Sequence, residues 1–306
     1  MLSRLALLLM AVWPATASLP CWVHDAAASG SHVWLLCERS EILRSPDTGQ
    51  TWTTTRVADG ANLHAIAFLD ERRGFITGDA GALWQTTDGG ATWTARQLDT
   101  TSHLTSIATA GQRLWAGGYG GTIFHSPDAG ASWVRQPTTA TRAIKDIFFL
   151  DQLHGWAVGW VGLILRTEDD GTTWEEIRTD ATGWTLASIH FRDPQNGWIT
   201  GPFGQILRST DGGKTWKMLE TPVRSWLTSI HFDARGRGWI TADRDILVSD
   251  DGESWRPLGL EEWMFLEQIL PVEDRLWGIG PFGLMINDGP SDKPWRQFTP
   301  AFSPST

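Results

Sequence analysis

Tyrosine, cysteine and positive charge are all scarce in this sequence. Its 306 residues include one Tyr and two Cys against 20 Trp, and 25 Lys and Arg residues face 35 Asp and Glu. The formal charge of −10 argues against nonspecific binding to nucleic acid, which requires clustered Lys and Arg to neutralise phosphates. A sustained helical period is also missing. We therefore expect no nucleic-acid partner, and a chain built from strands.

Long apolar runs are scarce as well. The clearest one, residues 5–13, is too short to span a bilayer. It follows Arg4 and precedes Ala15-Thr16-Ala17, which has the small-residue pattern of a cleavage site. Together these features predict a secretory signal peptide over residues 1–17, with a buried first strand or helix as the alternative. The remaining chain should then lie in the periplasm or an equivalent extracytoplasmic space, without a membrane span.

The abundant tryptophans are periodic. The motif Ser/Thr-x-Asp-x-Gly-x-Thr/Ser-Trp occurs at 45–52, 86–93, 126–133, 167–174 and 209–216, with a shortened copy at 249–255 and an eroded one ending at Trp295. Its tryptophans are 39 to 42 residues apart. A second aromatic series keeps the same period: Trp34, Phe75, Trp115, Trp156, Trp198, Trp239 and Trp277. A fixed period of this length is typical of repeat architectures.

Each unit of the repeat contains four short segments with the character of strands. In the second unit these are 63–68, 74–78, 82–86 and 92–98, and in the fourth they are 144–150, 155–159, 163–167 and 173–178. Seven such units predict an all-β, seven-bladed β-propeller of four-stranded antiparallel blades, formed as a single domain by residues 18–306. Because the units are in phase, we expect the ring to close without a shared strand. A non-closing solenoid is the alternative.

The repeated motif has the composition of a structural turn. Its hydroxyl and Asp side chains can accept hydrogen bonds from turn N–H groups, its Gly tolerates positive φ, and its Trp can pack into the sheet. The carboxylates recur around a rim and do not converge as an acid–base pair, and the motif lacks the alternating acids of a calcium loop. We therefore assign a structural role to Asp47, Trp52, Asp88, Trp93, Asp128, Trp133, Asp169, Trp174, Asp211, Trp216 and Trp255.

The two cysteines, Cys21 and Cys37, flank one predicted hairpin centred near Ser29 and Gly30. They should lie roughly opposite each other, and export permits oxidation. We predict a Cys21–Cys37 disulfide that staples the first blade. Two free, buried thiols are the alternative.

The motif resembles the Asp-box, or BNR, repeats of sialidases, sortilin-type receptors, some glucanases and the photosystem II stability/assembly factor family. The segments HGWAVG at 154–159, GLILRT at 162–167 and NGWITG at 196–201, each leading into a box, are most similar to the last of these families. The likeness extends over essentially the whole chain after residue 17. It implies an exported, non-enzymatic propeller that helps a membrane or envelope complex to assemble or persist.

The residue pattern does not indicate an enzyme. A sialidase-like site needs a Tyr nucleophile with a Glu partner, and Tyr119 lies in a glycine-rich turn with no obvious Glu beside it. Residues 191–194 approach a sialidase signature but fall on a turn within the fifth unit. There is no G-x-S-x-G and no placed Cys–His pair. We expect no catalytic residue and no cofactor, and keep a carbohydrate-binding or glycan-cleaving propeller as the alternative function.

The eight histidines are scattered along the chain. His190 and His231 occupy equivalent positions in adjacent units, where a structural strand histidine is favoured over a metal ligand. The sequence thus predicts no metal site.

The propeller topology sorts the loops onto two faces. Turns between the first and second strands lie with the boxes, whereas turns between the second and third strands lie with the connections between blades. On this second face, aromatic and Arg side chains stand outside both structural series, which is typical of binding surfaces. We predict a partner-binding site there, with four of its rings at matching turn positions (Tyr119, Trp160, Phe203 and Phe282) and its other members Arg142, Trp184, Arg224, Trp226 and Trp263.

The expected occupant of this site is a protein of a membrane or envelope complex, bound by a monomeric propeller. A glycan is the alternative, because exposed Trp also stacks on sugars. A third interpretation is that each ring merely covers the apolar edge of a neighbouring blade.

Overall fold

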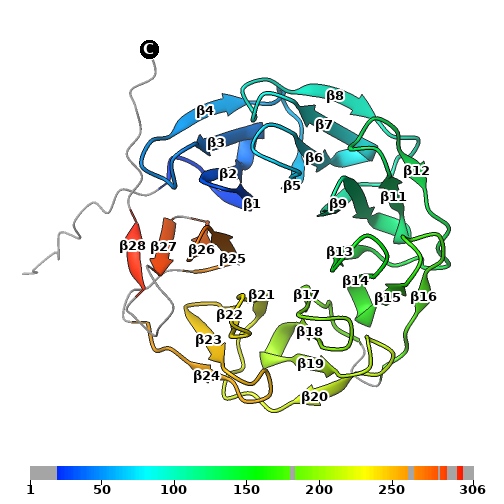
Figure 1. The fold of residues 1–306 in the computed structure, drawn as a ribbon, viewed down its shortest axis with the longest axis vertical. Coiled ribbons are helices and arrows are strands. Elements are labelled where there is room, and N and C mark those ends of the chain that lie inside the picture. Colours follow the sequence, from blue (N-terminus) through cyan, green and yellow to red (C-terminus); the bar gives the residue numbers. More distant parts are fainter. Residues whose placement is uncertain (1–18, 180–182, 261–264, 282, 288–294, 299–306) are drawn as a thin grey trace, which may run out of the picture.

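The computed structural model describes residues 19–179, 183–260, 265–281, 283–287 and 295–298. Seven four-stranded antiparallel sheets surround a central axis as the blades of a closed ring (Figure 1). The predicted all-β, seven-bladed propeller is therefore confirmed, and the described residues contain no α-helix. Within that part of the chain, no helix is long and apolar enough to cross a membrane. The predicted signal peptide lies outside the described residues.

The first strand of each blade lines the central axis, and the second strand pairs with its outer side. The first strands are β1 (Val23–Ser29), β5 (Leu63–Phe68), β9 (Leu104–Ala110), β13 (Ile144–Phe149), β17 (Ser188–Phe191), β21 (Leu227–Phe232) and β25 (Gln268–Val272). The second strands are β2 (His32–Cys37), β6 (Gly74–Gly78), β10 (Arg113–Gly118), β14 (Gly155–Gly159), β18 (Gly197–Thr200), β22 (Gly238–Ala242) and β26 (Arg275–Gly280).

The third and fourth strands complete each blade toward the periphery. The third strands are β3 (Glu41–Ser45), β7 (Ala82–Thr86), β11 (Ile123–Ser126), β15 (Ile164–Thr167), β19 (Ile206–Ser209), β23 (Asp245–Ser249) and β27 (Gly283–Asn287). The fourth are β4 (Thr53–Arg56), β8 (Thr94–Gln97), β12 (Val134–Arg135), β16 (Glu175–Glu176), β20 (Lys217–Leu219), β24 (Arg256–Pro257) and β28 (Arg296–Phe298). Some of these outer strands are shorter than predicted, because they pair on one side only and their side chains are mostly exposed.

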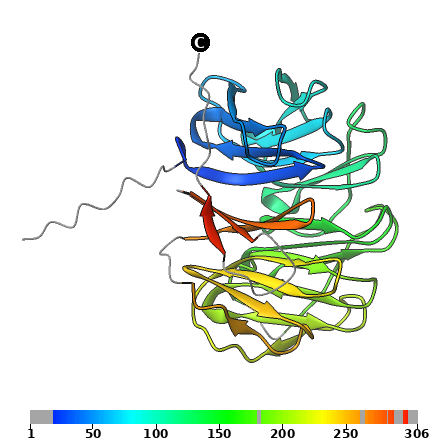
Figure 2. The ribbon, with the colours of Figure 1, turned by 60° about the vertical axis from the view of Figure 1, so that its left-hand side comes forward.

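The ring closes between the first and last blades without a shared strand, as predicted. Leu35 and Trp52 of the first blade join Trp277 and Leu284 of the last in one buried apolar cluster. Gln268 Nε2 also donates a hydrogen bond to the carbonyl of Ala26 at 3.1 Å. Figure 2 shows these two blades side by side in a lateral view.

Hydrogen bonds within the first five box turns follow one pattern. In the fifth blade, Asp211 Oδ1 accepts from the Thr215 N–H at 3.0 Å and Oδ2 accepts from the Thr215 hydroxyl at 2.6 Å. The Gly213 N–H donates to Ser209 Oγ at 2.8 Å. Equivalent contacts recur in other boxes, and in the second blade those from Thr92 lower the pKa of Asp88 to about 2. The box carboxylates are thus ionised acceptors within their own turns.

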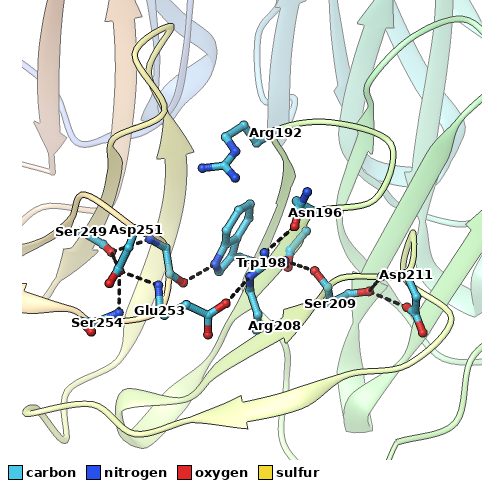
Figure 3. Close-up of polar contacts among 12 residues, drawn as sticks. Arg192, Asn196, Trp198, Arg208, Ser209, Asp211, Ser249, Asp251, Glu253 and Ser254 are labelled. Carbon is cyan, nitrogen blue, oxygen red and sulfur yellow. Dashed lines mark hydrogen bonds and ion pairs between the residues drawn. The ribbon is translucent and has the colours of Figure 1, made fainter.

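Four of the described box turns also hold the preceding blade through a backbone carbonyl. Figure 3 shows the junction between the fifth and sixth blades, where the Trp198 indole donates to the carbonyl of Gly252 at 2.7 Å. Trp34 and Trp156 make the same contact with the next blade, to Gly89 at 2.8 Å and Gly212 at 3.0 Å. These indoles of the second aromatic series are therefore bound by the box turn of the next blade.

A second set of contacts ties the first strands together along the axis, where a cavity of about 390 Å³ is lined by all seven of them. Asp25 Oδ2 accepts from the Ile66 N–H of the next blade at 2.8 Å, and Asp146 Oδ2 accepts from the Ile189 N–H at 2.9 Å. Burial outweighs these contacts: it raises the pKa of the Asp25 carboxyl to about 6 and also raises the pKa of the Asp146 carboxyl.

Cys21 and Cys37 are joined by a disulfide at the base of the first hairpin, with 5.7 Å between their Cα atoms. The hairpin pairs regularly from Ser29 opposite His32 to Asp25 opposite Leu36, and an irregularity between Asp25 and Val23 precedes the pair of Val23 with Cys37. Both cysteines are buried in the cluster that closes the ring.

Candidate partner-docking face

Short 3-10 turns and inter-blade connections meet on the face opposite the boxes. Three of these turns are η3 (Tyr119–Gly121), η4 (Trp160–Gly162) and η5 (Pro202–Gly204). The Gly162 N–H donates to the Trp184 carbonyl and the Gly204 N–H to the Ser225 carbonyl, both at 2.8 Å. These backbone bonds fix each turn against the connection that leads to the next blade.

This face carries an arc of exposed rings, here called the aromatic arc, made of Tyr119, Trp160, Trp184, Phe203 and Trp226. The rings are between 39% and 55% exposed, so each is partly packed and partly available to a partner. Tyr119 and Trp160 have ring centroids 5.4 Å apart, and Trp184 meets Phe203 edge to face at 4.8 Å. Pairs of this kind hold their rings in fixed orientations before any partner arrives.

The position predicted for Phe203 within its turn is wrong by one residue. Tyr119 and Trp160 are the first residues of their turns, but Pro202 takes that place in η5 and Phe203 is second. Phe203 is therefore the counterpart of Val161 and Gly120. The shared Gly-x-x-Gly spacing does not distinguish the two inner positions, which explains the error.

The second position of these turns is conformationally demanding. Val161 has φ of 52° and Phe203 has φ of 58°, in the left-handed region that bulky residues avoid. Both side chains are more than half exposed, so neither is held there by burial in the core. Strain of this kind costs about 1–3 kcal/mol per residue. Arg39 and Ala80 adopt the same conformation at the same turn position, so the repeated turn imposes it in several blades.

The two predicted arginines differ in their surroundings. Arg142 is half-buried, donates to the Val161 carbonyl at 2.8 Å and forms an ion pair with Glu176. It therefore braces the turn that carries Trp160. Arg224 is exposed.

Two other predicted members, Trp263 and Phe282, lie outside the described residues. Phe265 was missed by the sequence reasoning, although it belongs to the same inter-blade connection as Trp263. Its ring is 47% exposed, and the Arg244 guanidinium lies 4.9 Å from its centroid.

Trp160 and Trp226 also border the mouth of the axial channel, a hollow of about 690 Å³. Its lining includes His24, Lys145 and Glu267. Burial raises the pKa of Glu267 and lowers that of His24. The face thus combines fixed apolar rings with a polar, mixed-charge centre, which suits binding of a segment with both kinds of side chain.

His190 and His231 lie deeper in the fold, with ring centroids 5.2 Å apart. Burial lowers the pKa of His190 to about 3 and that of His231 to about 4, so both are neutral at physiological pH. Phe148 packs against His190 at 4.9 Å.

The fold and its repeats define an Asp-box propeller, and comparison with known proteins narrows the class. The family model described as "Photosynthesis system II assembly factor YCF48" matches residues 56–142, 134–220 and 176–271. Because these overlapping matches cover more than half of the chain, the protein belongs to this family.

Two relatives carry names from the same family. The chain is 35% identical over 88 residues to "Photosystem II assembly lipoprotein Ycf48" of Synechococcus sp. (strain CC9902), covering 28% of this chain and 26% of that protein. It is 33% identical over 89 residues to "Photosystem II stability/assembly factor HCF136, chloroplastic" of Arabidopsis thaliana, covering 26% and 22%. The matches therefore span about a quarter of these relatives' length.

Solved structures share the fold at low identity. "YCF48 bound to D1 peptide" aligns with a TM-score of 0.64 and 22% identity, covering 79% of this chain and 82% of that one. An enzyme shares the fold too: virginiamycin B lyase of Staphylococcus aureus aligns with a TM-score of 0.72 and 14% identity, covering 85% and 92%. The propeller alone therefore does not decide between binding and catalysis.

Proposed function

We propose that this protein is an exported, non-catalytic scaffold whose aromatic arc binds a protein of a membrane or envelope complex and assists its assembly or stability. The observation that carries the proposal is the aromatic arc itself. Five large rings stay substantially exposed on one face, and one of them, Phe203, occupies a strained turn position. The fold does not require such rings there, because Gly120 occupies the counterpart of Phe203 in the third blade.

The chemistry of the arc favours a polypeptide occupant. The exposed rings offer apolar contacts to side chains, and the polar channel mouth beside them can accept a charged or hydrogen-bonding group. Membership of a family described by an assembly function supports the same interpretation. The structural neighbour "YCF48 bound to D1 peptide" supports it as well, because that propeller holds a peptide.

Export follows from the pattern at residues 1–17 and forms part of the proposal. It agrees with the disulfide between Cys21 and Cys37, which persists in oxidising compartments. A glycan occupant is the competing outcome, since the same rings can stack on sugars.

The proposal is tested by capturing partners from the envelope fraction with three forms of the protein. The first is the wild type. The second carries Trp160→Ala, Trp184→Ala and Trp226→Ala. The third is a matched control with Val134→Ala, Leu153→Ala and Met218→Ala, whose side chains are 57%, 49% and 53% exposed but lie outside the arc. Captured proteins are quantified by mass spectrometry, and folding is checked by circular dichroism.

We expect the wild type and the control to retain the same subunits of a membrane complex, and the arc variant to lose them. Retention of those subunits by a folded arc variant would contradict the proposal. Loss of binding to a glycan array, with protein capture unchanged, would favour the sugar-binding alternative.

A further inference from the structure

Two histidines and an aspartate converge beside the aromatic arc. His64 lies on β5, Asp79 begins the turn η2 (Asp79–Gly81), and His103 immediately precedes β9 of the next blade. His64 Nε2 lies 2.7 Å from Asp79 Oδ1, and His103 Nδ1 lies 2.6 Å from the same oxygen. One nitrogen of each ring and this oxygen all lie within 4.8 Å of one another.

A further contact orients the carboxylate. Asn62 Nδ2 donates to Asp79 Oδ2 at 2.7 Å, which leaves Oδ1 facing the two imidazoles. His103 Nδ1 is closed to solvent and makes no hydrogen bond, despite its closeness to Oδ1. The cluster therefore brings three ligand atoms together and leaves one of them without a hydrogen bond of its own.

The propeller repeat does not require these residue types. Asp79 occupies the first position of its turn, where Tyr119 and Trp160 stand in the next two blades. In each of these blades, the N–H of the first turn residue donates a hydrogen bond to a backbone carbonyl of the segment before the first strand. The accepting residues are Asn62, His103 and Ala143, so His103 is the counterpart of an Asn and an Ala. The fold accepts unrelated side chains at these sites, and the grouping is particular to the junction of the second and third blades.

We propose that His64, Asp79 and His103 bind one divalent transition-metal ion of the class of Zn²⁺. Imidazole nitrogen and carboxylate oxygen are ligands of this class, and three protein ligands leave a coordination position open. A bound ion requires about 2.0–2.2 Å to each ligand atom, so the nitrogen–oxygen pairs open to roughly 3.3 Å on binding. His103 permits this movement because its side chain is 43% exposed.

The test uses the full chain without a polyhistidine tag, stripped with a chelator and dialysed. Zn²⁺ is titrated calorimetrically, and Co²⁺ is added as a spectroscopic probe. We expect saturation at one ion per chain and visible Co²⁺ absorption with imidazole ligation. The double variant His64→Ala/His103→Ala should lose this binding, and Asn62→Ala should weaken it by about 10- to 100-fold through the misplaced carboxylate.

His154→Ala is the matched control, because His154 forms an isolated pair with Asp151 at 2.8 Å outside the cluster. It should bind Zn²⁺ as the wild type does. Should the variants fail to fold, protection of His64 and His103 in the wild type against diethyl pyrocarbonate by Zn²⁺ gives the same answer. Absence of saturable binding overturns the proposal, and so does a folded double variant that binds like the wild type, or a lack of protection.

Discussion

At the scale of single residues, the glycine of several described boxes lies against a ring of the preceding blade. Gly213 has φ of 85°, and a Cβ built on it would lie 2.6 Å from Trp156 Nε1 of the preceding blade. The equivalent atom on Gly130 would lie 2.2 Å from Phe75, and on Gly252 it would lie 2.4 Å from Trp198. The glycine therefore permits the left-handed turn and also leaves room for the ring of the neighbouring blade.

Gly213→Ala should lower the free energy of unfolding by about 2–4 kcal/mol, because it adds backbone strain and a clash with a buried ring. Gly120→Ala is the matched control: its φ is 66° and a Cβ there meets nothing within 4 Å. We expect that change to cost only about 1 kcal/mol. Urea unfolding measures the stability of both variants. Equal losses of stability would show that the close approach of the ring to Gly213 is unimportant.

Val161 provides a second test at this scale. Val161→Asn keeps the size of the side chain but tolerates the left-handed conformation, so stability should rise by about 1 kcal/mol. Partner capture should weaken at the same time, because an exposed apolar contact next to Trp160 is lost. A variant that is no more stable than the wild type would show that the turn is not strained.

Sequence reasoning at the residue scale succeeded where a repeat supplied the pattern. The periodic tryptophans and box residues could be found because each occurs several times. Arg142 and Phe203 could be placed on a face but not within it, since a side chain's partners and its exact turn position depend on packing. Among the described residues the cluster of His64, Asp79 and His103 occurs once, although the blade phase places all three residues on one face.

At the scale of elements, two pairs of neighbouring first strands are joined by half-buried carboxylates whose ionisation is disfavoured. Burial raises the pKa of Asp25 to about 6, above its value in an unfolded chain. Between about pH 4 and pH 6 the native state therefore holds more protons than the unfolded state. The free energy of unfolding consequently falls as the pH rises through this window.

Asp25→Asn removes this titration and keeps a side-chain acceptor for the Ile66 N–H. Relative to the wild type, the variant should gain about 2 kcal/mol of stability between pH 4.5 and pH 7. Urea unfolding at several pH values gives the difference in free energy of unfolding between variant and wild type. The contributions of other titrating groups are common to both proteins and cancel. A constant difference across the range would mean that Asp25 has an ordinary pKa.

Element boundaries were most predictable in the inner three strands. The predicted segments 63–68, 74–78 and 82–86 coincide with β5, β6 and β7, because apolar residues mark strands packed between blades. The fourth strands were less well placed. β16 covers only Glu175–Glu176 against a predicted 173–178, since an edge strand leaves few buried positions to mark its ends.

At the scale of the whole molecule, counting the period yielded the number of blades, their phase and the two faces. The same count could not show how deeply each ring on the docking face is covered. That depends on the turns and connections of several blades together. The structure supplies the missing part: a fixed, half-exposed aromatic arc beside a polar channel mouth.

The most direct test of the docking claim is photo-crosslinking in the cell from single positions. p-Benzoylphenylalanine is placed at Phe203 in the arc, and at Leu153 as an exposed control on the box face. We predict that position 203 crosslinks to a subunit of a membrane complex and that position 153 does not. Absence of a crosslink from 203, or the same product from both positions, would contradict the docking claim.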